Sequence, residues 1–451
     1  MKKAIFLVLL LAAGAAGYWY WQEQQTKPEA QPQVPNKVEK TNPSPGQAAT
    51  KVRIELDEGL IARIDGQKVE KGSEISVGSH VVALKSADTF SYFSVQAEAG
   101  KPVMLAPETR IPAEHTPVLQ LNKTWAFFHA NAQNWDLSGQ NLVLNDGDHA
   151  ALLVDGTSGK EIWQSKAGPA GPKPLLAGEF VYIANAVGEI TPLRLKDGKA
   201  KGSFFLESGI QDWLVWGEDL IVASLDGRVQ RFSVKSGLFG SQKLKPMWSF
   251  EASEMRFEKL IQIDDSLLVT DGRGAFLALD AESGNKIWDD ETANEKTFGK
   301  GDATFQFVSE DAPFFWVTGD QTVILAQGQQ VRCRSRTTGE VIWSQKRNSA
   351  ITGIGKQWGL VAIASGASVS FFEIHKGLNC GQTQLPSPVM GRAIASQSGL
   401  IWAMGNQLIC FDYWEMKIHS QMSIPFQAID LLPTESGLLA VAEKGGVAAI
   451  N

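Results

Sequence analysis

Short apolar runs alternate with polar turns along most of this chain, and this pattern predicts β-strands rather than helices. Beyond Ala113 a β-prone run, a glycine-bearing turn and a second β-prone run recur eight times, as in "SLLVTDGRGAFLALD" and "LVAIASGASVSFFEI". The intervals between turn glycines are 41, 39, 47, 54, 38, 39 and 41 residues, for Gly147, Gly188, Gly227, Gly274, Gly328, Gly366, Gly405 and Gly446. Such a period is typical of a β-propeller with one four-stranded blade per repeat.

The repeats therefore predict an all-β fold, with a propeller over residues 114–451. We expect eight blades, with seven as the alternative. The last repeat stops at Asn451, directly after its second strand, so the outer strand of that blade must come from elsewhere. The segment "PVLQLNKTWAF", residues 117–127, is the expected source, with Trp125 as its outer-strand tryptophan. Closing the ring in this way would hide the free sheet edges.

A second turn follows the second strand in the first seven repeats. It carries glycine at Gly159, Gly198, Gly237, Gly284, Gly339 and Gly377, with Met416 in the seventh position. In three repeats a tryptophan stands four residues later. Glycine can adopt the positive φ of the turn, aspartate can accept N–H bonds across it, and the tryptophan can cover the gap to a neighbouring blade. The predicted structural motif comprises Asp155, Gly159, Trp163, Asp280, Gly284, Trp288, Gly339 and Trp343.

The region before the propeller divides into three parts. Residues 1–21 carry two lysines and then an apolar run that ends in aromatic residues, which predicts a membrane helix acting as a signal anchor, or alternatively a cleaved signal peptide. Residues 22–50 are rich in Gln, Pro, Lys and Glu and predict a disordered linker. Residues 51–108 contain short β-prone runs between Gly, Asp and Ser turns and predict a small β-sandwich.

Charge and cysteine content exclude some classes of function. The net charge of −7 argues against nucleic acid as a partner, because phosphate binding needs a concentrated basic surface. The three cysteines show no CxxC spacing, which favours buried free thiols over a zinc site or a disulfide framework. Together with the N-terminal signal, these features predict a periplasmic protein held in the inner membrane by its N-terminal helix, or a secreted protein after cleavage.

Two family resemblances follow from these motifs. The spacing of Ala278, Asp280, Gly284 and Trp288 resembles the tryptophan-docking motif of the PQQ-like propeller family, over roughly residues 114–451. That family includes quinoprotein alcohol dehydrogenases and a non-enzymatic BamB-like branch. Residues 51–108 resemble the PEGA family of extracytoplasmic β-sandwiches, which have an Asp-Gly hairpin and a glycine before an "HVVAL" strand.

The resemblance implies one of two functions. The favoured one is a non-catalytic, BamB-like scaffold that binds envelope proteins through its propeller loops, for example in cell-envelope or outer-membrane protein assembly, and that uses no cofactor. The alternative is a redox or small-ligand propeller that binds the quinone PQQ. A quinoprotein dehydrogenase needs a calcium ion held by Glu, Asn and Asp, and often a Cys-Cys pair, and we identify neither in this sequence. The turn "NDGDHA" is better explained as a hairpin than as a calcium site.

Two stretches are candidate partner-binding surfaces. In "VRCRSR" the two-residue period of a strand places Arg332, Arg334 and Arg336 on one face, which would suit an acidic partner, although a solvated face with cross-strand pairs is the alternative. The charged stretch of residues 289–307 would suit a docking loop or an ordinary decorated loop.

Overall fold

The computed structural model describes residues 51–105 and 121–450, with gaps at 86–89, 122, 129–133, 146–150, 166–171, 186, 237–241, 252–256, 272–274, 290–313, 320, 397–398, 435–436 and 443–445. Residues Lys51–Asn451 form one compact unit, separate from Met1–Thr50. The predicted membrane helix, the linker, most of the turn "NDGDHA" and the loop of residues 290–307 lie outside the described residues. Within the described residues, no helix is both long enough and apolar enough to cross a membrane.

Residues 51–105 form two sheets that share one apolar core. The first sheet has the order β4-β1-β7 and the second β3-β2-β5-β6. The strands are β1 (Lys51–Leu56), β2 (Ile61–Ile64), β3 (Gln67–Val69), β4 (Glu74–Ser76), β5 (Gly78–Lys85), β6 (Phe90–Ala97) and β7 (Val103–Leu105). Ile54 of β1, Leu84 of β5 and Leu105 of β7 are fully buried in the core between the sheets. This arrangement is the predicted small β-sandwich, whereas its membership of the PEGA family and the exact domain bounds stay predictions.

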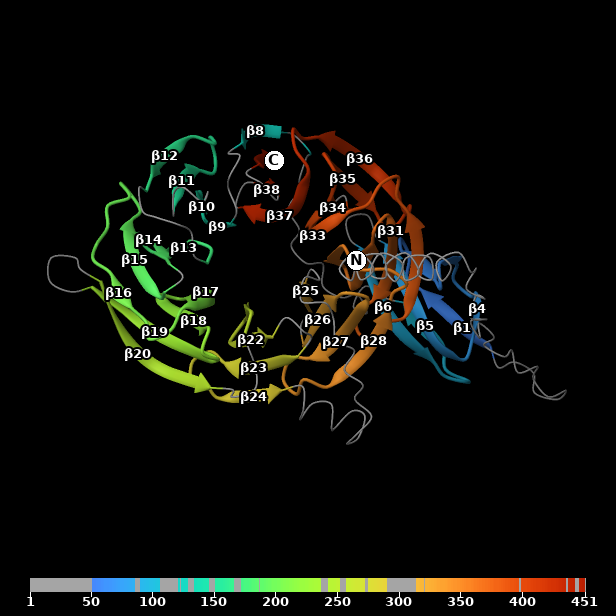
Figure 1. Cartoon of the computed structure of the whole chain (residues 1–451). Helices are drawn as coiled ribbons and strands as arrows, with labels where there is room; N and C mark the ends of the chain where they lie inside the picture. The colour runs from blue at the N-terminus through green and yellow to red at the C-terminus, as the bar shows by residue number, and fades with distance from the viewer. Residues whose placement is uncertain are drawn as a thin grey trace, which may run out of the picture. The chain divides into compact units, whose positions relative to one another are not determined.

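Beyond the sandwich, four-stranded antiparallel sheets follow one another around a ring (Figure 1). Their strands are β9 (Asn134–Ser138), β10 (Asn141–Asn145), β11 (Leu152–Asp155) and β12 (Glu161–Gln164); β13 (Leu175–Ala177), β14 (Phe180–Ala184), β15 (Glu189–Arg194) and β16 (Phe204–Phe205); β17 (Ile210–Trp216), β18 (Asp219–Ser224), β19 (Arg228–Ser236) and β20 (Gln242–Glu251); and β21 (Lys259–Ile263), β22 (Ser266–Thr270), β23 (Phe276–Asp280) and β24 (Lys286–Asp289).

The ring continues with four further sets of strands. These are β25 (Phe314–Thr318), β26 (Thr322–Gln327), β27 (Gln330–Ser335) and β28 (Val341–Lys346); β29 (Gly353–Gln357), β30 (Leu360–Ser365), β31 (Ser368–Glu373) and β32 (Asn379–Gln384); β33 (Met390–Ser396), β34 (Gly399–Met404), β35 (Gln407–Asp412) and β36 (Lys417–Ser423); and β37 (Ala428–Thr434), β38 (Gly437–Ala442) and β39 (Gly446–Ile450) with β8 (Lys123–Phe128). The predicted propeller fold is confirmed.

Closure of the ring follows the prediction from residues 117–127. Strand β8 pairs antiparallel with β39, with Trp125 opposite Ala449, and so supplies the fourth strand of the last sheet. Counted over the described residues of the ring, there are eight four-stranded units, because the eight-stranded sheet consists of β29–β32 joined to β33–β36. The assignment of these units to a ring of eight blades, rather than seven, stays our prediction.

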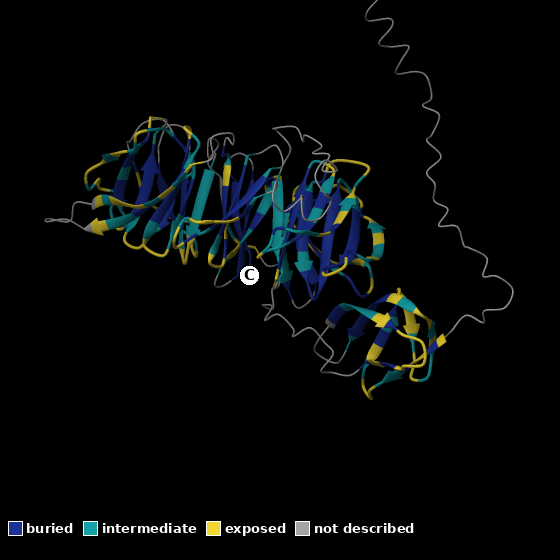
Figure 2. Ribbon diagram, turned by 90° about the horizontal axis from the view of Figure 1, so that it is seen from below, coloured by how far each residue is buried: buried dark blue, intermediate teal, exposed yellow. Residues whose placement is uncertain are grey.

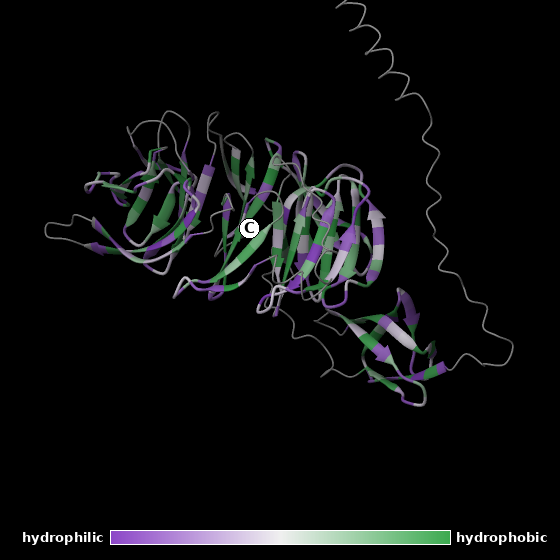
Figure 3. Ribbon diagram, turned by 60° about the horizontal axis from the view of Figure 1, so that its bottom comes forward, coloured by the Kyte–Doolittle hydropathy of each residue, from purple (hydrophilic) through white to green (hydrophobic). Residues whose placement is uncertain are grey.

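The pattern of burial explains why the second strand of a blade is mostly apolar. All six residues are buried in each of β26, β30, β34 and β38, because each blade lies between two neighbours that cover both of its faces. The residues of outer strands β28 and β36 are instead exposed or partly buried, except for the buried Trp343 of β28. Buried residues follow the strands and exposed residues gather in the turns (Figure 2), and the hydrophobic residues follow the strands in the same way (Figure 3).

The sandwich packs against the β29–β32 and β33–β36 blades. Its Tyr92 shares a hydrophobic cluster with Trp358 and Tyr413 of these blades, and the Tyr92 backbone N–H donates to the Trp358 carbonyl oxygen at 2.7 Å. The Arg63 Nη1 donates to the Trp414 carbonyl oxygen at 2.6 Å, and the Arg63 guanidinium lies 4.3 Å from the centre of the Trp414 ring. A cation over an aromatic face strengthens such a contact. The two predicted domains therefore pack against each other.

The three cysteines provide a test of this packing. Cys333 and Cys410 are buried, as predicted, whereas Cys380 is only partly buried and lines a small pocket with Arg63 and Tyr92 of the sandwich. Burial raises the pKa of all three thiols, that of Cys333 to about 12. Because the thiolate is the reactive form, we expect all three to resist iodoacetamide at pH 8 unless the protein is denatured.

Weakening the contact between sandwich and blades should change only one of these thiols. In the Arg63→Ala variant we expect Cys380 to be alkylated several-fold faster, because the sandwich that covers it is held less tightly, while Cys333 and Cys410 keep their native rates as internal controls. Mass spectrometry of the alkylated peptides measures each rate. Equal acceleration at all three cysteines would indicate general unfolding and contradict the expectation.

Candidate functional site

The tryptophans of the predicted motif connect successive blades. The Trp288 ring, on outer strand β24, lies against Gly339 in the turn of the next blade, where φ is +72°. A Cβ added at Gly339 would lie 2.4 Å from Trp288 Cδ2, which no side chain tolerates. The Trp288 Nε1–H donates to the Arg336 carbonyl oxygen at 2.9 Å. Each such tryptophan therefore docks on the glycine of the following repeat, and only glycine fits beneath the ring.

The same contact recurs around the ring. Trp125 contacts Gly159, Trp163 contacts Gly198, Trp248 contacts Gly284, and Trp343 contacts Gly377. Their Nε1–H groups donate respectively to the carbonyl oxygens of Gly156, Leu195, Ala281 and Ile374. The role expected for Trp125 is thus present in the structure.

The aspartates of the motif organise the turns that hold these glycines. Asp155 Oδ1 accepts from the backbone N–H groups of Thr157 at 2.9 Å and Ser158 at 2.8 Å. Hydrogen bonds from the Thr157 side chain and from these N–H groups lower the pKa of Asp155 to about 2. Asp280 Oδ1 likewise accepts from Ser283 N at 2.7 Å and Ser283 Oγ at 2.6 Å, which lowers its pKa. Both turns therefore carry a carboxylate that stays ionised in mild acid.

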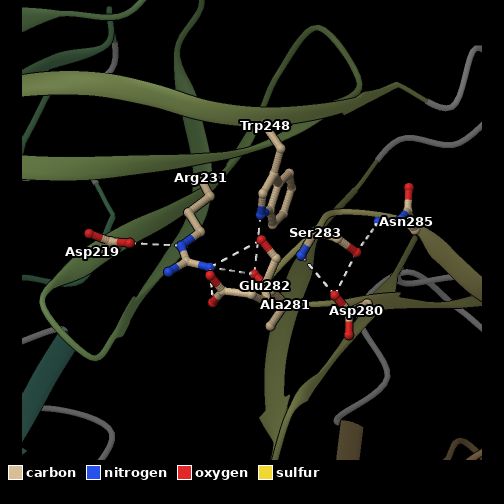
Figure 4. Close-up of polar contacts among 8 residues, drawn as sticks. All are labelled: Asp219, Arg231, Trp248, Asp280, Ala281, Glu282, Ser283 and Asn285. Atoms are coloured by element: carbon tan, nitrogen blue, oxygen red, sulfur yellow. Dashed lines mark hydrogen bonds and ion pairs between the residues drawn. The ribbon is translucent and has the colours of Figure 1, made fainter.

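A buried arginine strengthens one of these junctions (Figure 4). Arg231 of β19 is 8% exposed, and its Nε donates to Asp219 Oδ2 at 2.8 Å. The Arg231 Nη1 reaches the next blade, where it donates to Glu282 Oε2 at 2.6 Å and to the Ala281 carbonyl oxygen at 3.1 Å. That carbonyl oxygen also accepts the Trp248 Nε1–H. The stretch "ALDAESGNKIW", residues 278–288, thus supplies the hydrogen-bond acceptors of a contact between blades.

The motif changes where the sandwich packs. The residue four after Gly377 is Gly381 rather than tryptophan, and the next turn carries Met416, with φ +53°, rather than glycine. A Cβ added at Gly381 would lie 3.4 Å from the Met416 Cε, so the methionine side chain extends toward the space that a docking tryptophan would fill. Strands β29 and β33 also pair directly at this junction, with Gly353 opposite Gly391.

The predicted arginine face is wrong for Arg334. The two-residue alternation of β27 holds, because Arg332 and Arg334 pair in unbroken register with β26. Arg334 is nevertheless fully buried, since its guanidinium lies against the rings of Phe276 and Trp288 from the neighbouring blade. Arg334 Nη1 donates to the Gly339 carbonyl oxygen at 2.9 Å and its guanidinium lies 5.9 Å from the centre of the Trp288 ring. Arg336 pairs with Asp264, whereas Arg332 is half-buried on β27. The three arginines therefore do not form one binding surface.

A cavity of about 520 Å³ opens among the first strands of several blades, which face the middle of the ring in Figure 1. Its walls come from β9, β21, β33 and β37, together with a residue just before β13. The lining residues are Asn134, Trp135, Asp136, Leu137, Lys173, Lys259, Arg392, Leu432 and Pro433. This size and mixture of apolar and polar groups are typical of a binding site.

First-strand aspartates hold this region together. Asp136 Oδ2 accepts from Leu176 N at 2.7 Å, Asp212 Oδ2 from Leu260 N at 2.9 Å, and Asp430 Oδ1 from Arg392 N at 3.0 Å. Each bond joins the first strands of two blades. Sequence reasoning missed these aspartates, although their signal is visible: a single Asp directly before a Leu or Trp in the first strand, as in "NWDL", "IQDWL" and "AIDLL".

The cavity lining does not fit the calcium ion of the alternative hypothesis. Calcium requires several oxygen ligands, and Asp136 is the one carboxylate among the lining residues, already bonded to Leu176 N. In the part of the chain that the structure describes, no three His, Cys, Asp or Glu side chains gather closely enough to hold a metal ion.

A family model described as "Outer membrane protein assembly factor BamB" matches residues 147–296 and 243–413, which together exceed half of the chain. The chain belongs to this BamB family. The predicted resemblance to PQQ-like propellers and their BamB-like branch is thereby confirmed. A search of curated proteins gives no match.

Solved structures agree on the fold of this BamB-family chain. BamB from Moraxella catarrhalis matches with a TM-score of 0.53 and 14% identity, over 73% of this chain and 97% of that one. Sqt1 from Saccharomyces cerevisiae matches with a TM-score of 0.54 and 11% identity, over 75% of this chain and 100% of that one. The computationally designed Ika8 protein matches with a TM-score of 0.52 and 11% identity, over 74% and 100% of the two chains. At such identities these likenesses concern the fold alone.

Proposed function

We propose that this BamB-family protein is a non-catalytic scaffold of the cell envelope that binds another protein through the cavity among its first strands. The observation that carries the proposal is the cavity itself, whose lining combines apolar side chains with Lys173, Lys259 and Arg392. Such a mixture of an apolar surface and a few placed charges suits recognition of a partner segment. The family match, to an outer-membrane protein assembly factor by its description, supports an envelope role.

The proposal includes the place of the protein in the cell. The lysines and the apolar run of residues 1–21 support export to the periplasm, with the N-terminal helix holding the chain in the inner membrane. In this arrangement the linker of residues 22–50 would tether the folded unit to the membrane.

Photo-crosslinking in intact cells tests the proposal by position. We expect p-benzoylphenylalanine at Pro433, an exposed residue of the cavity lining, to capture one defined envelope protein. The same group at Ile162, which is 47% exposed on outer strand β12, is the matched control and should not capture it. Capture of the same proteins from both positions, or none from Pro433, would remove the support for a cavity-bound partner.

The non-catalytic part of the proposal has its own test. The purified full chain is incubated with PQQ and calcium and assayed for dye-linked alcohol oxidation. We expect no activity above that of the free quinone. Turnover that requires the protein would overturn the scaffold hypothesis and leave the redox propeller in its place.

A further inference from the structure

The cavity carries positive charge in a chain that is negative as a whole. Its lining contains three cations, Lys173, Lys259 and Arg392, and one carboxylate, Asp136, whereas the whole chain has a net charge of −7. The three cations come from segments far apart in the sequence, so the fold alone gathers them. A concentrated charge in a concave site attracts a ligand group of the opposite sign more strongly than the same charges spread over a surface.

The cations differ in how they are held. Arg392 Nη2 donates to Asp430 Oδ2 at 2.9 Å, and its guanidinium lies 5.5 Å from the centre of the Trp316 ring, so its position is fixed. Neither Lys173 nor Lys259 forms an ion pair with a carboxylate among the residues that the structure describes. The two lysines can therefore contact a ligand without first breaking an internal salt bridge.

The one carboxylate that lines the cavity, Asp136, has a structural role. Asp136 Oδ2 accepts the Leu176 N–H at 2.7 Å and thereby joins two first strands. Burial raises the pKa of Asp136, while the Leu176 N–H and the nearby charge of Lys173 act in the opposite direction. Asp136 nevertheless places a negative charge in the lining, and a bound anion would be repelled by it.

Apolar side chains form the rest of the wall. Trp135, Leu137, Leu432 and Pro433 lie beside the cations around the same cavity. A glutamate side chain matches this combination, because its methylene groups can cover apolar surface while its carboxylate pairs with a lysine. We propose that the cavity binds an acidic, glutamate-bearing segment of the partner protein, with Lys173 and Lys259 pairing with its carboxylates; this inference rests on the proposed function.

A defined peptide tests the inference on the full chain. The probe is a short fluorescein-labelled peptide of alternating glutamate and alanine, and the measurement is fluorescence anisotropy. We expect the glutamate peptide to bind and its glutamine counterpart not to bind. The double substitution Lys173→Gln and Lys259→Gln should weaken binding about five- to tenfold, the range for two partly exposed ion pairs, and should flatten its dependence on salt.

Substitutions with opposite effects separate recognition from damage to the fold. Asp136→Asn keeps an oxygen that can accept the Leu176 N–H but removes the negative charge, so binding should become about two- to fivefold tighter. Lys245→Gln, at an exposed position of outer strand β20, is the matched control and should leave binding unchanged. A midpoint of thermal unfolding equal to that of the wild-type protein would confirm that each variant is folded.

Three outcomes would overturn the inference. The first is equal binding of the glutamate and glutamine peptides, and the second is unchanged binding of the glutamate peptide by the double lysine variant. The third is full displacement of the peptide by citrate at the same carboxylate concentration, because this would indicate a site for small polyanions. Crosslinking from Pro433 separates this failure from failure of the scaffold hypothesis. If the peptide assay gives one of these outcomes while Pro433 still captures the envelope partner, the scaffold stands and the acidic segment is excluded.

Discussion

Replacing Trp288 by alanine is expected to lower the free energy of unfolding by about 3–5 kcal/mol, the range for loss of a large buried aromatic side chain. Trp288 is only 3% exposed and its Nε1–H donates to the Arg336 carbonyl oxygen of the next blade. Gly339 beneath the ring has no side chain that could refill the space. Urea unfolding followed by far-ultraviolet circular dichroism measures the change.

Ile287 provides the matched control for Trp288. It is the preceding residue on the same strand and is 40% exposed, so Ile287→Ala should change the free energy of unfolding by less than about 1 kcal/mol. If both variants lost similar stability, the effect would come from the strand itself. Docking of the tryptophan on the next blade would then contribute little to the free energy of unfolding.

Replacing Arg231 by methionine is expected to cost about 2–3 kcal/mol of stability. Methionine fills much of the space but leaves Asp219, whose side chain is 16% exposed, without its cation. Breaking a buried ion pair is costly because the remaining charge stays desolvated. We place the cost below the full range for buried pairs because the second partner, Glu282, is 76% exposed.

Arg228 is the control for Arg231, since it lies on the same strand β19 and also pairs with carboxylates. Its side chain is 35% exposed and its partner Glu207 is 90% exposed, so Arg228→Met should cost less than about 1 kcal/mol. The difference between the two variants in the free energy of unfolding, measured by the same urea titration, isolates the effect of burial. Equal losses would contradict the role assigned to the buried position.

Local spacing was enough to predict the propeller and its closing strand. The glycine turns and the Gly-to-Trp spacing recur at fixed places, and the missing outer strand of the last repeat pointed to Trp125. The partner of each tryptophan could not be predicted in this way. Spacing relates Trp288 to Gly284 in its own repeat, whereas the ring docks on Gly339 in the next, and this depends on how twisted sheets stack.

The arginine face and the cavity show where the sequence signal ends. The two-residue period correctly placed Arg332 and Arg334 on one face of the strand, but the neighbouring blade covers that face at Arg334, and no residue type in "VRCRSR" marks this cover. Lys173, Lys259 and Arg392 have no shared motif and meet only because the ring brings their strands together. A cluster built by tertiary structure leaves no local pattern to detect.

The pairing of β8 with β39 also bears on how the chain is made. One sheet contains both β8 and β39, so this sheet cannot form until the chain has been synthesised from Lys123 as far as Ile450. At ordinary rates of translation that delay is on the order of tens of seconds. Throughout it, β8 has no partner and the nascent ring has open edges that can pair with other chains. We therefore expect the pairing of β39 with β8 to be the step that removes the open sheet edges through which the growing chain could aggregate.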